Sequence, residues 1–371
     1  MIYLHVPFCR GFCTYCAFYS EVLPCGSGQR RVRGYVETVL REIRERTGEI
    51  RRTRLLSPDT LYIGGGTPSV LPLSVLETLL QACREATGDP AHRFGECTLE
   101  ANPDDVVRGG LPYLQGLRDA GVNRLSVGIQ SFDDAVLRWM NRRHDAAAAR
   151  QAVRLIRDAG FDNLSIDLIF GIGGMTDRSW KETLDEALAL HPQHLSAYQL
   201  SVEPDSFLEE RLAAGQWKEA SEAQCRRQYG QLCTALRQAG YRHYEVSNFA
   251  LPGYEAVHNS AYWRRVPYVG LGPGAHSLSP DGRGRRWNSQ DVEDYTPGSE
   301  NLSDEDIRLE TLMLALRTAD GLDEEALRSL AASGRIDALL AGKSLARQKN
   351  RRIRIPENRF FVSDEIVREL A

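Results

Sequence analysis

The sequence predicts an α/β fold, with a partial (β/α)6 barrel of the TIM type followed by a small winged-helix-like α+β domain. Two observations predict the barrel: strand-like and helix-like runs alternate six times before about residue 215, and alternate residues of several strands are polar. A third observation predicts the second domain, because helical stretches after residue 300 precede two strand-like runs on either side of a Pro-Glu-Asn turn at 356–358, and then a last helix.

Each of six strand-like runs is followed by a helix-like run, which is the order of β/α units in a parallel sheet. The strand-like runs are residues 2–6, 60–63, 97–102, 123–130, 163–170 and 193–200. The helix-like runs cover about 30–49, 73–87, 111–120, 132–159, 177–190 and 204–214.

One face of these strands is polar at a period of two residues. The polar positions are Tyr3, His5, Thr98, Glu100, Asn102, Arg124, Ser126, Gly128, Gln130, Asn163, Ser165 and Asp167, and the positions between them are largely apolar. A closed eight-stranded barrel fills its interior with branched apolar side chains. A polar inner face therefore predicts an open barrel around a wide, ligand-filled lumen.

We expect three regions: the barrel over residues 1–215, an extension of the barrel over 216–300, and the winged-helix-like domain over 301–371. Winged helices often bind DNA, but residues 301–371 carry 12 Lys and Arg against 13 Asp and Glu. Because the basic footprint of a nucleic-acid-binding domain is missing, we interpret this region as a lid or docking domain and expect no nucleic acid partner.

The composition is that of an ordinary globular protein of 371 residues with a formal charge of −4. No segment has the roughly 20 apolar residues of a membrane helix, so we expect at most peripheral membrane contact. Of the eight cysteines, three are clustered and five are scattered. This is not a disulfide framework, and it favours the reducing cytoplasm.

Three cysteines, Cys9, Cys13 and Cys16, lie within eight residues in the spacing C-x3-C-x2-C. A four-iron cluster usually takes four thiolates, so three would leave one iron open to a small ligand. A zinc knuckle is the alternative, but no nearby residue completes a standard zinc spacing. The stretch resembles the radical S-adenosylmethionine (SAM) superfamily, and this resemblance implies a [4Fe-4S] cluster whose open iron binds SAM.

Polar or glycine-rich residues follow the ends of the other strands, where barrel enzymes place their sites. Gly64 to Pro68 read GGGTP, which alone would be an ordinary turn. The remaining positions are Glu100, Asn102, Gln130, Arg142 and Asp167. Each could be a solvated surface residue, but their order along successive strand ends predicts that they line one site.

The order and spacing of these motifs resemble the oxygen-independent coproporphyrinogen III oxidase-like branch of radical SAM proteins. The resemblance implies that Tyr3, Gly65 and Glu100 contact the cluster-bound SAM and that Tyr15 lies against a SAM. Positions that contact a second SAM in the true oxidase match Gly66, Thr67, Gln130, Arg142 and Asp167. Residues 171–174 read GIGG where the branch usually has GLPG, so a proline that would stiffen this loop is missing.

The decarboxylating oxidase has a further cysteine two residues after the third, and this chain has Phe18 there. Residues 258–263, HNSAYW, resemble the HNxxYW motif of the heme chaperone branch. A neutral imidazole is a natural axial heme ligand, and aromatic rings can pack on a porphyrin. The predicted heme residues are therefore His258, Asn259, Tyr262 and Trp263, with His276 a weaker candidate. The alternative is ordinary aromatic packing on a loop.

The resemblance implies a heme chaperone that binds a [4Fe-4S] cluster, SAM and heme, and that delivers heme to respiratory hemoproteins. A flavodoxin or ferredoxin would be the reductant. We expect no coproporphyrinogen III dehydrogenase activity. Two rival hypotheses remain: a radical SAM enzyme that decarboxylates a porphyrin, or methylates heme and opens its ring, and a binding module whose cluster is structural or senses redox state.

Overall fold

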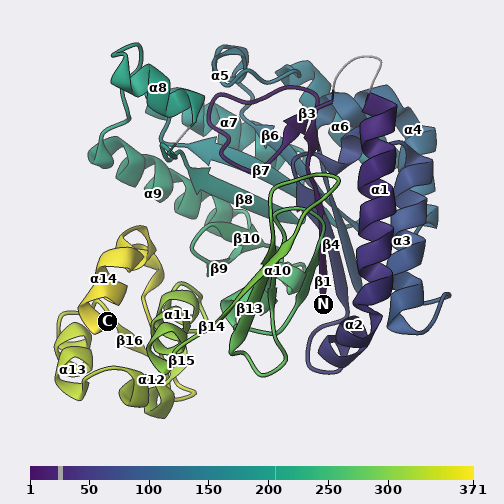
Figure 1. The fold of residues 1–371 in the computed structure, drawn as a ribbon. Helices are drawn as coiled ribbons and strands as arrows, with labels where there is room; N and C mark the ends of the chain where they lie inside the picture. The colour runs from purple at the N-terminus through teal and green to yellow at the C-terminus, as the bar shows by residue number, and fades with distance from the viewer. Residues whose placement is uncertain (24–27, 205) are drawn as a thin grey trace.

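A nine-stranded sheet forms the centre of the computed structural model, which describes residues 1–23, 28–204 and 206–371 (Figure 1). The strand order is β11-β1-β4-β5-β6-β7-β8-β10-β9, and it is parallel from β11 to β8. The six strands of the predicted units are β1 (Ile2–Val6), β4 (Thr60–Gly65), β5 (Glu96–Ala101), β6 (Arg124–Gln130), β7 (Leu164–Phe170) and β8 (His194–Gln199). The predicted fold, a partial (β/α)6 barrel, is confirmed.

Helices cover the outer face of this sheet (Figure 1). They are α1 (Gly28–Glu45), α2 (Thr47–Arg54), α3 (Leu73–Thr87), α4 (Pro103–Asp119), α5 (Asp134–Trp139), α6 (Ala146–Asp158), α7 (Asp177–Ala189), α8 (Phe207–Ala213) and α9 (Glu222–Gln238). The helices predicted over 132–159 are α5 and α6, and Asn141 between them has a left-handed φ of 58°. Helix α4 begins earlier than predicted, directly after β5, and is kinked at Gly110.

The alternation along β6 shows how the sheet separates core from lumen. Leu125, Val127 and Ile129 are 0% exposed and pack in the hydrophobic core under the helices. The residues between them, beginning with Arg124 and ending with Gln130, face the lumen. The predicted polar inner face is therefore the lining of an open barrel.

Elements from the predicted extension flank the barrel on both sides. Strands β9 (Arg242–Glu245) and β10 (Asn248–Ala250) continue the sheet beyond β8, and β11 (Val269–Leu271) continues it beyond β1. Helix α10 (Val257–Trp263) lies at the amino-terminal ends of β4 and β5. A separate sheet holds β12 (His276–Leu278), β13 (Gly284–Asn288) and β14 (Pro297–Asn301).

The C-terminal elements form a small body at the lower left of Figure 1. They are α11 (Asp304–Leu316), β15 (Leu322–Asp323), α12 (Glu324–Leu330), α13 (Ser333–Ala341), β16 (Ala346–Arg347), β17 (Arg352–Arg354), a 3-10 helix η2 (Glu357–Val362) and α14 (Ser363–Leu370). This is the helix and strand order of a winged helix. The domain boundaries at 215 and 300 remain a prediction.

One detail of the C-terminal prediction is wrong. The two strand-like runs were expected on either side of the Pro-Glu-Asn turn, whereas β17 pairs with the preceding β16 and the run after the turn is η2. The helical turn places Phe360 at 1% exposure, with its ring perpendicular to that of His243 and the two ring centroids 5.0 Å apart. Among the described residues, no helix is long and apolar enough to cross a membrane.

Candidate functional site

A cavity of about 730 Å³ runs through the lumen, from the loop after β1 down to helix α10. The predicted site residues that line it are Cys9, Cys13, Tyr15, Cys16, Gly65, Gly66, Thr67, Glu100, Gln130, Arg142, Asp167 and Asn259. These residues come from segments up to 250 positions apart in the sequence, and the fold brings their side chains to one cavity. Phe18 also lines the cavity, at its mouth, where its side chain is 76% exposed.

The three clustered cysteines are positioned by contacts with later strand ends. Cys9 lies in the short strand β2 (Phe8–Cys9), and its Sγ is 3.3 Å from the Thr67 hydroxyl. The Arg142 guanidinium donates to Cys13 Sγ at 3.4 Å. Cys16 follows in the same loop, and its amide donates to the Cys13 carbonyl at 3.3 Å.

The arrangement of these thiols fits a multi-iron cluster. All three are free and partly exposed to the cavity. Among the residues that the structure describes, their sulfur atoms are not gathered within 4.8 Å of one another, as the ligands of a single metal ion would be. A set of three spaced thiols facing an open cavity suits a [4Fe-4S] cluster with one iron left for a small ligand.

The glycines of GGGTP allow the second strand end to approach the cysteine loop. A Cβ on Gly66 would lie 2.7 Å from the Phe8 carbonyl oxygen, and one on Gly65 would lie 2.6 Å from the ring of His5. Gly65 also has a φ of 111°, which side chains rarely adopt. The motif is therefore required for close packing as well as for backbone access to a ligand.

Glu100 is the carboxyl group nearest to this glycine-rich turn. It accepts hydrogen bonds from the Tyr62 hydroxyl at 2.6 Å and from the Gly65 amide at 3.1 Å. Burial raises the pKa of Glu100 to about 7, with a further contribution from Asp167, although both hydrogen bonds act to lower it. Near neutral pH this group can therefore either accept or donate a hydrogen bond to a ligand.

Asp167 and Arg142 face the same cavity from neighbouring positions. Burial also raises the pKa of Asp167, which accepts hydrogen bonds from Ser126 at 3.1 and 3.2 Å. Arg142 donates to Asn102 at 2.6 Å and to the Gly128 carbonyl, so its guanidinium is held between the cysteine loop and two strand ends. Beside it, Gln130 has a left-handed φ of 69°, which is unusual for a non-glycine residue and typical of functional sites.

Tyr3 lies outside the cavity lining. Its ring stacks at 6.2 Å on Tyr62, which does line the cavity, and its hydroxyl is 3.1 Å from His5 Nδ1. Tyr3 therefore supports the wall behind Glu100, one layer away from the position that the resemblance implies.

The structure places HNSAYW at the opposite end of the barrel from the cysteines. His258 is 1% exposed, with Nδ1 2.8 Å from the Thr60 hydroxyl and Nε2 3.0 Å from the Tyr262 hydroxyl. Of the four predicted heme residues, only Asn259 lines the cavity. His276 lies in β12, stacked on Trp287, and is likewise not part of the cavity lining.

Several lining residues were not among the predicted ligand-binding residues, among them Arg124 and His194 at the starts of β6 and β8 and Tyr198 near the carboxyl end of β8. Arg124 is 2% exposed, and no hydrogen-bond partner is found for its Nε within the described residues. Burial, together with the charge of Arg124, lowers the pKa of His194 well below its usual value. The polar alternation along the strands pointed to Arg124, but no motif marks His194 or Tyr198.

A partial (β/α)6 barrel with three cysteines at the mouth of its lumen defines a radical SAM protein. Residues 3–187 match the model of the radical SAM superfamily. The chain is 37% identical to the heme chaperone HemW of Lactococcus lactis over 74% of this chain and 68% of that protein. It is 36% identical to HemW of Synechocystis over 86% and 78% of the two chains, and 31% identical to HemW of Mycobacterium tuberculosis H37Rv over 100% and 94%.

The chain therefore belongs to the HemW heme chaperone family of radical SAM proteins. Among solved structures, the coproporphyrinogen III oxidase of Escherichia coli matches with a TM-score of 0.81 over 100% of this chain and 89% of that one. Its sequence identity is 22%, so this likeness shows the fold alone. The resemblance to the heme chaperone branch of the oxidase-like radical SAM proteins, inferred from motifs, is confirmed by the superfamily match and the HemW relatives.

Proposed function

We propose that this protein binds a [4Fe-4S] cluster, SAM and heme, and that it delivers heme to heme-requiring proteins. The observation that carries this proposal is the cavity with three free thiols at its mouth, in a chain whose relatives are named heme chaperones. We also propose that it works in the cytoplasm, with respiratory hemoproteins as recipients and a flavodoxin or ferredoxin as reductant.

Cys9, Cys13 and Cys16 would hold three irons, and the remaining iron would face the lumen. A bound cluster supplies the electron that cleaves SAM in this superfamily. Glu100 and the amide-rich turn at Gly65 and Gly66 offer hydrogen bonds to a SAM at the open iron. Gln130, Arg142 and Asp167 line the next part of the cavity, where their amide, guanidinium and carboxyl groups would hold a second ligand of the same kind.

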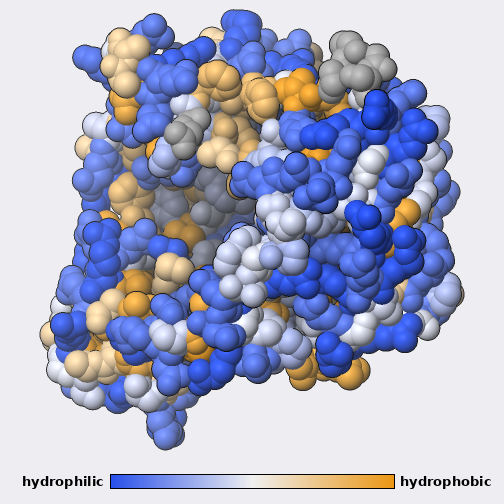
Figure 2. Space-filling view, viewed as in Figure 1, coloured by the Kyte–Doolittle hydropathy of each residue, from blue (hydrophilic) through white to orange (hydrophobic). Residues whose placement is uncertain are grey.

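Exposed aromatic side chains at the cavity mouth support heme binding there. The exposed fractions are 42% for Phe12, 76% for Phe18, 47% for Tyr198 and 54% for Phe207, and the rings of Phe12 and Phe207 are 6.5 Å apart. Figure 2 shows apolar side chains gathered at the upper edge of the molecule, where Figure 1 places the loop around β3 (Glu21–Val22). Such exposed apolar surface suits a flat apolar ring system such as a porphyrin.

Axial ligation by His258, with Tyr262 and Trp263 against the ring, remains part of the proposal and requires a rearrangement. Both ring nitrogens of His258 are hydrogen-bonded, and burial, together with the N-terminal charge, lowers the pKa of His258 to about 3. The imidazole is therefore neutral, as a heme ligand must be, but helix α10 has to move before Nε2 can reach iron. His276 is the alternative ligand, and comparing His258→Ala with His276→Ala in hemin titrations distinguishes them.

The decisive experiment is anaerobic reconstitution with iron, sulfide, SAM and hemin, followed by mass spectrometry of the tetrapyrrole and by transfer to a heme-free cytochrome. A chaperone leaves the heme chemically unchanged and passes it to the cytochrome. A methylated or ring-opened product would instead establish the catalytic alternative. Binding without transfer and without SAM cleavage under reduction would leave a structural or redox-sensing cluster.

The oxidase alternative has its own test, because the chain has Phe18 where the decarboxylating enzyme has a further cysteine. With SAM and a reductant, we expect no conversion of coproporphyrinogen III to protoporphyrinogen IX. Chromatographic detection of the decarboxylated product at one or more equivalents per chain would overturn the chaperone proposal.

A further inference from the structure

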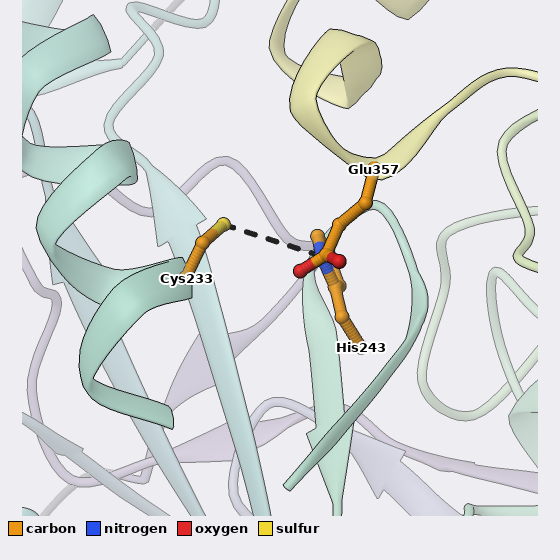
Figure 3. Close-up of side chains that lie close together, drawn as sticks. All are labelled: Cys233, His243 and Glu357. Atoms are coloured by element: carbon orange, nitrogen blue, oxygen red, sulfur yellow. Dashed lines mark hydrogen bonds and ion pairs between the residues drawn. The ribbon is translucent and has the colours of Figure 1, made fainter. Parts of the chain in front are cut away.

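Three potential metal ligands meet where the C-terminal body touches the barrel extension (Figure 3). Cys233 comes from α9, His243 from β9 and Glu357 from the first residue of η2. Their ligand atoms all lie within 4.8 Å of one another. Within this set, Cys233 Sγ is 4.0 Å from His243 Nδ1, which is 3.3 Å from Glu357 Oε1.

The imidazole of His243 is held so that Nδ1 points at the other two residues. On the opposite side of the ring, Nε2 is 3.4 Å from the Val246 carbonyl oxygen and 3.4 Å from the Tyr229 hydroxyl. The ring stacks on Phe249 at 4.0 Å, and its side chain is only 3% exposed. Metal-binding histidines are commonly oriented in this way, with the nitrogen that does not bind metal donating to a backbone carbonyl.

This orientation allows His243 to present a lone pair toward Glu357. When the proton of the neutral ring is on Nε2, it donates to the Val246 carbonyl, and the lone pair of Nδ1 faces a carboxylate oxygen at 3.3 Å. In the other tautomer, Nδ1 donates to Glu357 and Nε2 accepts from the Tyr229 hydroxyl. In the first tautomer, a metal ion between Nδ1 and the carboxylate satisfies both acceptors.

The thiol of Cys233 favours the metal. Zinc–sulfur and zinc–nitrogen bonds of about 2.3 and 2.0 Å at tetrahedral angles place S and N about 3.5 Å apart, and two ligands at about 2.0 Å lie about 3.3 Å apart. The observed separations are 4.0 Å for sulfur and nitrogen and 3.3 Å for nitrogen and oxygen, and all three ligand atoms lie within 4.8 Å of one another. A shift of about half an ångström therefore brings Cys233 to the sulfur–nitrogen separation of a zinc site, in a set of sulfur, nitrogen and oxygen ligands, the types that zinc prefers.

We propose that Cys233, His243 and Glu357 bind a zinc ion that fastens the C-terminal body to the barrel extension. Glu357 is separated from His243 by 114 positions, so the ion would connect two distant parts of the chain. On binding, the Cys233 thiol loses its proton to solvent and the thiolate becomes a ligand. Glu357 keeps its contact with Arg237, which donates to Oε1 at 2.9 Å from a side chain that is 63% exposed.

The test uses the full chain with its cluster reconstituted, so that Cys9, Cys13 and Cys16 are occupied. We expect wild-type protein to bind one zinc ion per chain by metal analysis and calorimetry. Cys233→Ala and Glu357→Gln should each weaken zinc binding at least tenfold. The matched controls are Cys225→Ala, a second cysteine of α9, and Glu365→Gln, an exposed carboxylate of α14, and both should bind zinc as wild type does.

Cobalt(II) in place of zinc gives a second readout. A thiolate-to-cobalt charge-transfer band should be present in wild type and in Cys225→Ala and absent in Cys233→Ala. Zinc should raise the unfolding temperature of wild type and not of Glu357→Gln, because only an ion bound to the folded state stabilises it. If the cluster-loaded wild type binds no zinc, or if Cys233→Ala and Glu357→Gln bind it unchanged, the proposal is wrong.

Discussion

The ring of His258 closes the amino-terminal end of the barrel. We expect its removal to lower the free energy of unfolding. The ring connects the Thr60 hydroxyl at the start of β4 to the Tyr262 hydroxyl in α10, and its own amide donates to Glu96 at 2.8 Å. In His258→Ala both hydroxyls lose their partner at a site where His258 and Thr60 are each 1% exposed. The backbone contact to Glu96 is unaffected.

The expected magnitude follows from these two orphaned groups. A buried polar group left without its partner costs about 1–3 kcal/mol, so the two groups orphaned in His258→Ala should lower the free energy of unfolding by about 2–6 kcal/mol. Thr60→Val removes only the first hydrogen bond and should cost about 1–2 kcal/mol. Because the two residues share that bond, a double-mutant cycle should give a coupling energy of about 1 kcal/mol.

Urea unfolding of the four proteins, followed by circular dichroism, measures these differences directly. Thr60→Val also separates structure from heme ligation, since valine and threonine are both unable to bind iron in place of the imidazole. Hemin titration of Thr60→Val should therefore give the wild-type Soret spectrum, whether or not His258 is the axial ligand. A loss below about 0.5 kcal/mol in His258→Ala, the range of ordinary surface substitutions, would refute the structural role assigned to the ring.

Two further predictions concern the cluster and a buried carboxyl group. Reconstituted wild type should bind about four irons per chain. The triple alanine variant of Cys9, Cys13 and Cys16 should lose this iron and Cys225→Ala should keep it, as measured by iron analysis and electron paramagnetic resonance. A cluster retained by the triple variant would contradict the ligand assignment. Burial raises the pKa of Glu245, which is 0% exposed, from 4.5 to about 7. Between pH 4.5 and about 7, the Glu245 carboxyl group is ionised in the unfolded chain and protonated in the folded chain. Its contribution to the free energy of unfolding therefore falls as the pH rises, by about 2 kcal/mol from pH 5.5 to 8. Glu245→Gln should remove this part of the pH dependence in urea titrations, and an unchanged pH profile would show that the carboxyl group titrates normally.

Much of the fold follows from local pattern. The period of two along 123–130 distinguishes the residues that face the lumen from those that face the core, because alternate residues of a strand must face opposite sides. The order of strand ends likewise places Glu100, Gln130 and Asp167 in one cavity, since parallel strands finish at the same edge. These inferences need no knowledge of distant contacts.

The location of HNSAYW could not be derived in that way. The motif lies in a segment after the sixth β/α unit, and local sequence does not state whether such a segment returns to the carboxyl or the amino ends of the strands. Glu96, at the amino-terminal end of β5, determines the position of this segment. Its carboxylate accepts hydrogen bonds from the amides of Val257 and His258 at 2.8 Å each, which holds α10 at that end of the strand. A pairing between positions about 160 residues apart leaves no signal in either segment alone.

The loop at residues 171–174 shows how a departure from the family pattern is accommodated. The missing proline corresponds to Gly173, where a Cβ would lie only 1.7 Å from the Lys218 carbonyl oxygen. The segment after α8 has therefore closed onto the loop, and Trp217 donates to the Gly173 carbonyl at 3.2 Å while its ring lies 5.5 Å from Trp139. Packing supplies the stiffness that a proline ring would otherwise give. Since Gly173 and Trp217 constrain each other, the loss of the proline does not leave the strand end beside Asp167 unsupported.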